Sequence, residues 1–233
     1  MYMITDAHFL TIFIVMAAFL VTPFYLLATY AFSGASIGKG AILGAIALVF
    51  GAFMFWVCLA GIPSKLGLPG NLIVPAAWFL PSLLLYWKRD WVLEKPLSQK
   101  WIVGLQLFRV IGGVFLIEMA RGNVPAVFAY PAGIGDILAG LLALYVLIKY
   151  GRAPSIPRGA IFAVIGFGML DFISAFFFGF TSAESPLQLF YPEPASRLIW
   201  YPTGLIPLFL VPYAIFFHTL SWLNEARYPA VGN

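Results

Sequence analysis

Three ionisable side chains, Arg109, Asp136 and Asp171, lie inside long apolar stretches of the chain. A charge placed in hydrocarbon costs about 2.5–3.5 kcal/mol on insertion scales, so such residues normally face a polar interior and have partners. One guanidinium and two carboxylates could anchor a small anion or carboxylate, or relay protons or cations. They could equally form a buried ion pair that only fixes the order of the helices. The residue types therefore suggest ion handling, with a structural pin as the alternative.

Small residues accompany each of these charges at the spacing i, i+3, i+7, which places each set on one helix face. The sets are Gln106, Arg109 and Gly113; Gly133, Asp136 and Gly140; and Gly168, Asp171 and Ala175. Glycine beside a carboxylate lets a neighbouring helix approach closely. We therefore predict that these three faces meet.

A fourth seam of small and polar residues ends in a histidine near the carboxyl-terminal end of the last apolar run. It comprises Gly204, Pro207, Val211, Ala214, His218 and Ser221. Histidine titrates near physiological pH, so His218 could act as a proton exit. We predict a ligand-binding site near the middle of the bilayer, lined by Gln106, Arg109, Asp136, Asp171 and His218.

The composition requires these residues to lie in a membrane protein. Of 233 residues, 62% are apolar and 9% are charged, whereas an average soluble domain has about 25% charged residues. So few polar side chains cannot cover a water-soluble globule. The apolar residues form continuous runs rather than the alternation of a β-barrel. We therefore predict an all-α integral membrane protein.

Seven apolar runs are candidates to cross a bilayer, for which a helix needs about 20 residues. They lie at residues 8–31, 41–62, 72–87, 101–119, 125–148, 159–180 and 198–222. The third run is near the minimum length and contains Pro75 and Pro81, so it could be kinked, short or partly re-entrant. We predict a single domain, residues 1–233, built as a bundle of seven transmembrane helices.

With seven spans, the basic residues separate onto two sides. Nine lie on one side: Lys39, Lys88, Arg89, Lys95, Lys100, Lys149, Arg152, Arg158 and Arg227. Three lie on the other side, namely Lys65, Arg121 and Arg197. Because cytoplasmic loops carry the excess of Lys and Arg, the amino terminus is predicted outside and the carboxyl terminus in the cytoplasm. The protein is expected in the cytoplasmic (inner or plasma) membrane.

Two features near the outer surface have simpler interpretations. We expect Glu118 to reach the interface or to pair with Arg121, and we expect Asp6 and His8 to lie at headgroup level. The loop from Thr181 to Arg197 is rich in proline and apolar residues and could lie over the outer mouth as a lid.

Several cofactor classes are excluded by missing residues. A retinal Schiff base needs a lysine deep in the last helix, and no lysine follows Lys149. A bis-histidine haem needs paired histidines, whereas His8 and His218 are predicted near opposite surfaces. A zinc site needs about three clustered ligands. Cys58 is the single cysteine, so no intrachain disulfide can form. We predict no metal site and leave the cofactor open.

The segment Gly133-Ile134-Gly135-Asp136 resembles the GxGD motif of intramembrane aspartyl proteases and prepilin peptidases. The resemblance covers four residues and implies a catalytic aspartate dyad, whose second member would be Asp171. In those families the partner aspartate precedes the motif, whereas Asp171 follows it.

Two further functional hypotheses remain open. The first is a transporter or channel-like protein for a small polar or anionic solute, with or without proton coupling. The second is a non-catalytic membrane subunit or a sensor of a hydrophobic ligand, which would use Phe176, Phe177 and Phe178 to contact lipid, pigment or a partner helix. A homo-oligomer or a partner membrane subunit is compatible with either, and nucleic acid is not an expected partner. A wet cavity that reaches Asp136 would favour transport, and a dry ion pair would favour the second hypothesis.

Overall fold

A computed structural model describes residues 7–66, 70, 72–184, 187–196 and 199–229. All the regular elements in these ranges are helices, as the composition predicted. Two residues named above, Asp6 and Arg197, lie outside the described residues.

Six of the helices are long and apolar enough to cross a membrane. Four are continuous: α1 (Phe9–Phe32), α2 (Ile37–Leu59), α9 (Ala126–Tyr150) and α10 (Arg158–Thr181). Two are composite: α7 (Gln99–Leu105) continues through the 3-10 segment η1 (Gln106–Gly113) into α8 (Val114–Ala120), and the π-helical η2 (Ile206–Leu210) continues into α11 (Val211–Arg227). The short helices α3 (Ile62–Leu66) and α6 (Arg89–Val92) lie in connections.

The third apolar run forms α5 (Ile73–Trp87), which is shorter than the other six. Fifteen residues at 1.5 Å each extend about 22 Å, compared with about 30 Å for the hydrocarbon core. The helix contains Pro81 and packs along α11. Its shortness agrees with the expectation for this run.

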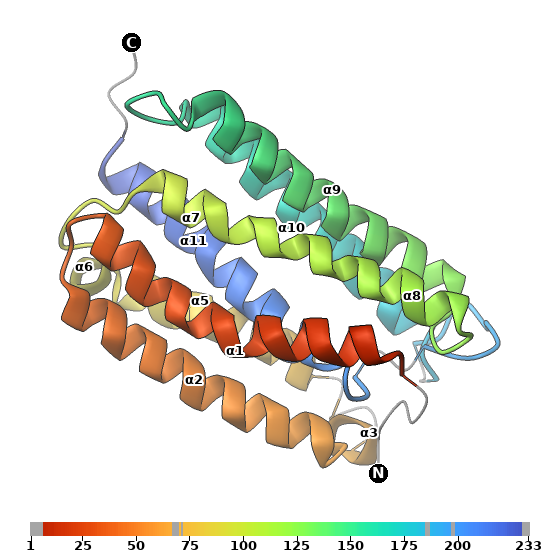
Figure 1. The fold of residues 1–233 in the computed structure, drawn as a ribbon. Helices are drawn as coiled ribbons and strands as arrows, with labels where there is room; N and C mark the ends of the chain where they lie inside the picture. Colours follow the sequence, from red (N-terminus) through yellow and green to blue (C-terminus); the bar gives the residue numbers. More distant parts are fainter. Residues whose placement is uncertain (1–6, 67–69, 71, 185–186, 197–198, 230–233) are drawn as a thin grey trace.

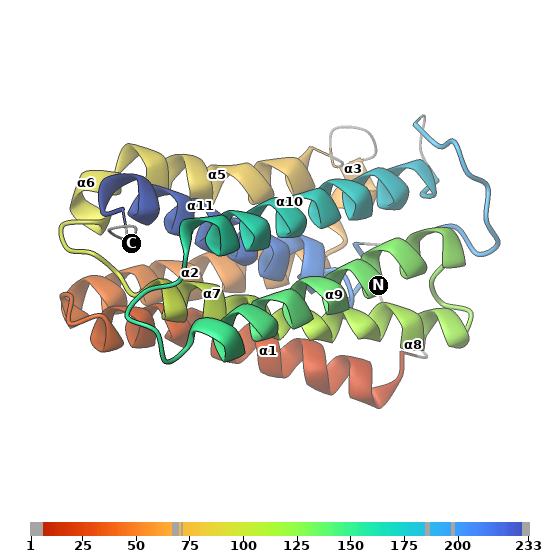
Figure 2. The same ribbon diagram turned by 90° about the horizontal axis from the view of Figure 1, so that it is seen from above.

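The helices run side by side, and the two views separate their layers (Figures 1 and 2). α1 and α2 form one hairpin, while η1, α8, α9 and α10 form the opposite part of the bundle. α11 is the central element, because it contacts α5, α7 and α10 and is buried along most of its length. The core of the protein is therefore organised around the last helix.

The last helical span starts and ends later than the sequence predicted. Instead of residues 198–222, it covers Ile206–Arg227. Pro207 therefore lies in the first turn, where a residue without an N–H is tolerated. At the other end, Asn224 accepts from the backbone N–H of Leu97 and donates to its carbonyl, both at 2.9 Å. This pairing holds the helix beyond its apolar run.

A tryptophan satisfies a carbonyl that the prolines of this span leave free. In η2 the N–H of Val211 bonds to the carbonyl of Ile206, five residues earlier. The same spacing would pair the carbonyl of Pro207 with the backbone nitrogen of Pro212, but that nitrogen has no hydrogen to donate. Instead, Nε1 of Trp78 donates to the Pro207 carbonyl at 2.7 Å. The hydrogen bond ties α5 to the start of the central helix.

The loops at one end of the bundle are joined by basic side chains. Lys39 pairs with Glu94, and Arg227 pairs with Asp90. The Lys39 ammonium holds the pKa of the Glu94 carboxyl below its ordinary value. Nζ of Lys100 donates to two backbone carbonyls of the loop between α9 and α10. The basic loops therefore contact one another at the end where α11 finishes.

Glu118 at the opposite end is fully buried, so the expectation that it reaches the surface is wrong, whereas its pairing with Arg121 stays a prediction. Its side chain is fully buried and accepts hydrogen bonds from the backbone N–H of His8 at 2.9 Å, the hydroxyl of Thr11 and the amide of Asn123 at 2.7 Å. These donors replace the water that the carboxylate loses on burial. Glu118 thereby fastens the start of α1 to the end of α8.

The described part of the loop expected to act as a lid folds back on the end of α10. The backbone N–H groups of Leu189 and Phe190 both donate to the Thr181 carbonyl at 2.8 Å. The ring of Phe190 lies 5.9 Å from that of Phe178. These contacts hold the loop beside α10.

Candidate functional site

Arg109 is the centre of a buried polar cluster. The residue is 1% exposed, and its Nε donates a hydrogen bond to Oδ1 of Asp136 at 2.8 Å. Its Nη2 donates to Oδ2 of Asp171. The three side chains come from η1, α9 and α10. The structure therefore brings the three charges of the long apolar helices into direct contact.

The 3-10 geometry of η1 selects which residues share the face of Arg109. A 3-10 helix has three residues per turn, so Gln106, Arg109 and Gly112 align, and these three are the buried residues of the segment. The α-helical spacing used for the sequence prediction placed Gly113 there instead. Gly113 is only partly buried, so this detail of the prediction is wrong.

Three glycines leave the space that the charged side chains occupy. A Cβ on Gly112 would overlap the side chain of Asp136, and a Cβ on Gly135 would overlap the carboxyl of Asp171. A Cβ on Gly168 would lie 2.7 Å from Nη1 of Arg109. The cluster can therefore form only where these three positions lack a side chain.

The glycines predicted to flank Asp136, Gly133 and Gly140, contact the neighbouring helix and not the charged side chains. A Cβ on Gly140 would lie 2.8 Å from Cγ1 of Val110 and 3.1 Å from its backbone nitrogen. A Cβ on Gly133 would lie 3.0 Å from Cγ of Leu116. Both glycines let α9 pack closely on η1 and α8, as small residues do in membrane bundles.

An aromatic ring covers the guanidinium. Cζ of Arg109 lies 3.9 Å from the centroid of the Phe172 ring, an arrangement worth about 2 kcal/mol when it is desolvated. Phe172 directly follows Asp171, so one turn of α10 supplies both a carboxylate and a ring. The sequence analysis did not single out Phe172, although its adjacency to Asp171 was the available signal.

His218 joins this cluster from α11. It is buried, and its ring centroid lies 6.2 Å from that of Phe172. Its Nε2 occupies the space where a Cβ of Gly168 would stand, next to Nη1 of Arg109. The sequence analysis placed His218 toward one end of the helix as a separate exit, whereas the structure places it against the central charges.

Three polar atoms of the cluster have no hydrogen-bond partner among the described residues: Nη1 of Arg109, Nε2 of His218 and Oε1 of Gln106. Nε2 of Gln106 donates to the Ala214 carbonyl at 3.4 Å, one helical turn from His218. Nη1 of Arg109 can only donate and Oε1 of Gln106 can only accept, and buried atoms of this kind are commonly satisfied by ordered water.

The cavities that touch Asp136 are small. One, beside Arg109 and Phe172, has a volume of about 10 Å³, and another, between Trp78 and Phe176, has about 20 Å³. A buried water needs about 10–15 Å³. Each cavity is therefore comparable in size to one water molecule and does not hold a larger solute.

The charges of the cluster imply a bound proton. Asp136 and Asp171 both bond to the single guanidinium of Arg109. With both carboxyl groups ionised, the three side chains would carry a net negative charge in a buried site, which is costly. One proton shared by the two aspartates makes the net charge of the three side chains zero.

The cluster offers little for catalysis. The two aspartates are adjacent, as the resemblance to the GxGD motif implies, but Arg109 bonds to both and the adjoining cavities have no room for a peptide. Within the described ranges, no group of three or more His, Cys, Asp and Glu side chains is arranged to hold a metal ion.

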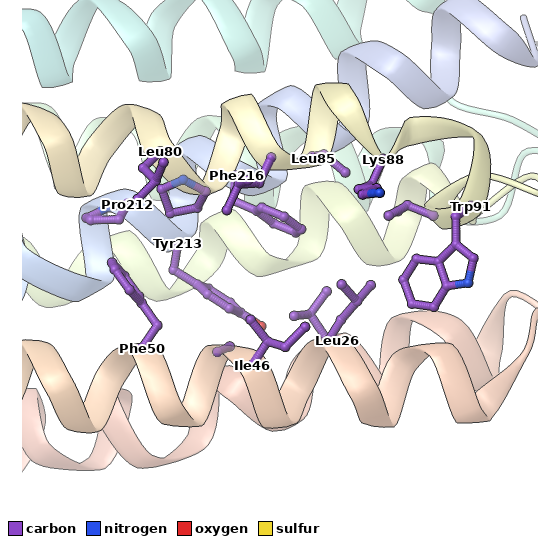
Figure 3. A pocket seen from close by; sticks show the side chains of 15 residues that line it. Leu26, Ile46, Phe50, Leu80, Leu85, Lys88, Trp91, Pro212, Tyr213 and Phe216 are labelled. Carbon is purple, nitrogen blue, oxygen red and sulfur yellow. The ribbon is translucent and has the colours of Figure 1, made fainter.

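A much larger cavity of about 320 Å³ lies between α1, α2, α5 and α11 (Figure 3). Its walls are almost entirely apolar and include Leu26, Ala47, Phe50, Leu80, Tyr213 and Phe216. Lys88 and Trp91 lie together at one end of it (Figure 3). The sequence analysis did not find this cavity, because its lining comes from helices that are far apart in the sequence.

The phenylalanines proposed for ligand contact do not line this cavity. The ring of Phe176 packs on Trp78 at 5.3 Å and on Phe180 at 4.3 Å, both between centroids. Phe177 is exposed on the outside of α10. Its ring lies 5.3 Å from that of Phe178, and the contact of these rings with lipid, pigment or a partner helix stays a prediction.

Residues 70–223 match the family model described as a domain of unknown function, DUF8737. The match spans more than half of the chain and contains every residue of the polar cluster. No curated protein and no solved structure matches the chain. A chain that carries this domain over α5 and the four long helical spans that follow it belongs to the DUF8737 family.

Proposed function

We propose that the protein spans the cytoplasmic membrane seven times, with the amino terminus outside and the carboxyl terminus in the cytoplasm. The support for six spans is the length and apolar composition of the six long helices. α5 is proposed as the seventh because it packs along the central helix. The proposed orientation rests on the basic loops that meet where α11 ends, since an excess of Lys and Arg is typical of cytoplasmic loops.

The topology is tested by cysteine labelling in intact cells. The native Cys58 is buried, so it is first replaced by Ala. Single cysteines at Lys95 and Arg227 should resist a membrane-impermeant maleimide until the membrane is opened. Tyr191→Cys, at an exposed position in the loop after α10, should react from outside. Labelling of residue 95 or 227 in intact cells contradicts the proposed orientation.

We further propose that the protein binds a membrane amphiphile in the apolar cavity. The single observation that carries this proposal is an apolar cavity bounded by α1, α2, α5 and α11. Its volume of about 320 Å³ falls in the range of about 300–1,000 Å³ typical of ligand sites. The cavities at the charge cluster are far smaller. The geometry therefore favours the second of the two hypotheses, a hydrophobic-ligand-binding membrane protein.

The charge at the cavity mouth favours a ligand with an anionic headgroup. Lys88 lines the cavity, and no ion pair among the described residues includes it. Lys39, its basic neighbour across Trp91, is already paired with Glu94. We assign the cavity to an acyl chain and Lys88 to a phosphate headgroup, which a lysine ammonium binds as a point charge.

The ligand assignment is tested by thermal unfolding of the purified protein in detergent with added phosphatidylglycerol or phosphatidylcholine of the same chain length. Phosphatidylglycerol should raise the Tm more, because a ligand that binds only the folded state stabilises it. Ala47→Phe, which fills the cavity, should abolish the response to both lipids. Ala52→Phe lies on the exposed side of the same helix and should keep it. An equal response of both variants contradicts the cavity site.

Lys88→Gln tests the headgroup contact separately. It should lower the preference for phosphatidylglycerol over phosphatidylcholine by roughly tenfold, because a hydrogen bond to a charged group contributes about 1.5–3 kcal/mol. Lys95→Gln removes an exposed cation from the same loop region and should leave the preference unchanged. A preference that survives Lys88→Gln contradicts the role of Lys88.

Proton-coupled transport is the second candidate, and one observation favours it. The cluster contains buried polar atoms without partners, on Arg109, His218 and Gln106, which is typical of sites that handle water or ions. A polar or anionic solute has no cavity of its size next to Asp136. The ion that this site would move is therefore the proton.

A further inference from the structure

A stripe of buried polar residues leads from the charge cluster to one end of the bundle. His218, Ser221 and Glu225 follow the spacing i, i+3, i+7 and share one face of α11. They are 3%, 3% and 1% exposed. Seven residues of helix cover about 10 Å, so the stripe connects the cluster with the basic loops where α11 ends.

The stripe continues onto a neighbouring helix. The Ser221 hydroxyl donates to Oε1 of Gln99 at 2.8 Å, and Nε2 of Gln99 donates to the Ser221 carbonyl at 2.9 Å. Gln99 is the first residue of α7, so it lies at the same end of the bundle as Glu225. Along α11 the imidazole of His218, the hydroxyl of Ser221 with its partner amide from α7, and the carboxyl of Glu225 therefore follow one another.

Unpartnered atoms occur at both ends of this stripe. At the inner end they are Nη1 of Arg109 and Nε2 of His218, and at the outer end Oε1 of Glu225. All three residues are more than nine-tenths buried. Buried polar atoms are rarely left without partners, and ordered water is the usual partner where protein supplies none.

The opposite half of the bundle is apolar next to the cluster. The cavity on that side of Asp136 is lined by rings of Trp78, Phe115, Phe128 and Phe176. Phe115 and Phe128 meet edge to face with their centroids 5.0 Å apart. Aromatic side chains cannot pass a proton along hydrogen bonds, so the polar route leaves the cluster on one side only.

We infer that the Asp136–Asp171 pair binds one proton and exchanges it with water through His218, Ser221 and Glu225. The step is reversible: a hydronium ion gives its proton to the carboxylate pair, which leaves water and a carboxylic acid hydrogen-bonded to the other carboxylate. The ionisable groups around the pair are Arg109 from η1 and His218 from α11. The inference uses the charge cluster and not the apolar cavity, so either proposal can fail without the other.

The proton is tested by infrared spectroscopy of the purified full-length protein in lipid nanodiscs. The wild type should show the carbonyl band of a buried carboxylic acid. Asp136→Asn and Asp171→Asn should each lose that band, because the remaining carboxylate keeps its ion pair with Arg109 and needs no proton. A band that is absent from the wild type, or that survives in both variants, overturns the proton site.

The route is tested by the rate at which this band shifts after transfer to D₂O. Glu225→Gln and the smaller change Ser221→Ala should both keep the carbonyl band. They should slow its shift in D₂O by about a hundredfold, because a positioned proton-transfer group contributes at least about that factor to a rate. Glu118→Gln changes a buried acid at the other end of the bundle and should leave the rate unchanged. Unchanged rates in Glu225→Gln and Ser221→Ala overturn the route, and slowing by Glu118→Gln instead reverses its direction.

Discussion

Replacing Arg109 with Gln is expected to destabilise the folded bundle by about 3–5 kcal/mol, as is usual when one partner of a buried ion pair is removed. The guanidinium bonds to carboxylates from two helices and carries a ring on its face. Without it, two adjacent carboxyl groups remain in an apolar space. The measurement is thermal unfolding in detergent, followed by tryptophan fluorescence.

The double variant Arg109→Gln/Asp136→Asn separates a structural pin from a working site. It removes one charge of each sign and leaves Asp171 free to take up a proton, so it should be more stable than Arg109→Gln alone. Any infrared carbonyl band of a buried carboxylic acid in this variant should then come from Asp171, because residue 136 no longer carries a carboxyl group. Arg158→Gln changes an exposed arginine and should alter stability by less than about 0.5 kcal/mol. A double variant no more stable than the worse single variant shows that residues 109 and 136 are not coupled.

Gly112→Ala is expected to destabilise the protein, whereas Gly113→Ala should not. A Cβ at residue 112 would overlap Cβ of Asp136, an atom fixed to the backbone of α9, so η1 and α9 must separate. Overpacking of this kind costs about 1–3 kcal/mol. At residue 113 the nearest atom is Cδ1 of Ile137 at 3.4 Å, an ordinary contact. Gly113→Ala should therefore stabilise the folded protein by about 0.5–1 kcal/mol, because alanine loses less backbone conformational entropy on folding than glycine does.

The adjacent pair of glycines also tests the 3-10 segment itself. If residues 106–113 formed an ordinary α-helix, the face of Arg109 would contain Gly113 and the two effects would exchange. The readout is the Tm of both variants in the same detergent, with the infrared carbonyl band as a check that the aspartates remain paired. Equal Tm values for the two variants would contradict the close approach of η1 to α9.

Much of the fold followed from hydropathy along the chain. The runs that became α1, α2, α9 and α10 end within a few residues of their predicted limits, because the length of an apolar run and its flanking polar residues depend on sequence alone. The start of the last span was misplaced because the apolar residues of 199–204 continue its hydropathy although they are not helical. Hydropathy does not distinguish a buried loop from a span.

The candidate site was predicted in composition and not in detail. An unpaired charge in an apolar run is costly, so charges at similar positions along neighbouring runs are expected to pair. Arg109, Asp136 and Asp171 were therefore identifiable from their positions in the runs. Glu118 was misjudged because its donors, His8 and Thr11, are more than one hundred residues earlier in the chain. Glu225 was missed because it lies beyond the last apolar run.

The sequence by itself determined that the chain forms long apolar helices able to span a membrane, and that three charges lie at similar positions along three of them. Both properties depend on distance along a single helix, which is set by a constant rise per residue. Only the tertiary structure decided that η1 narrows to a 3-10 helix, that His218 joins Arg109 across Gly168, and that the cavity forms between four helices. Those features depend on how helices rotate and pack against partners distant in the sequence, and the apolar residues around each helix leave that rotation undetermined.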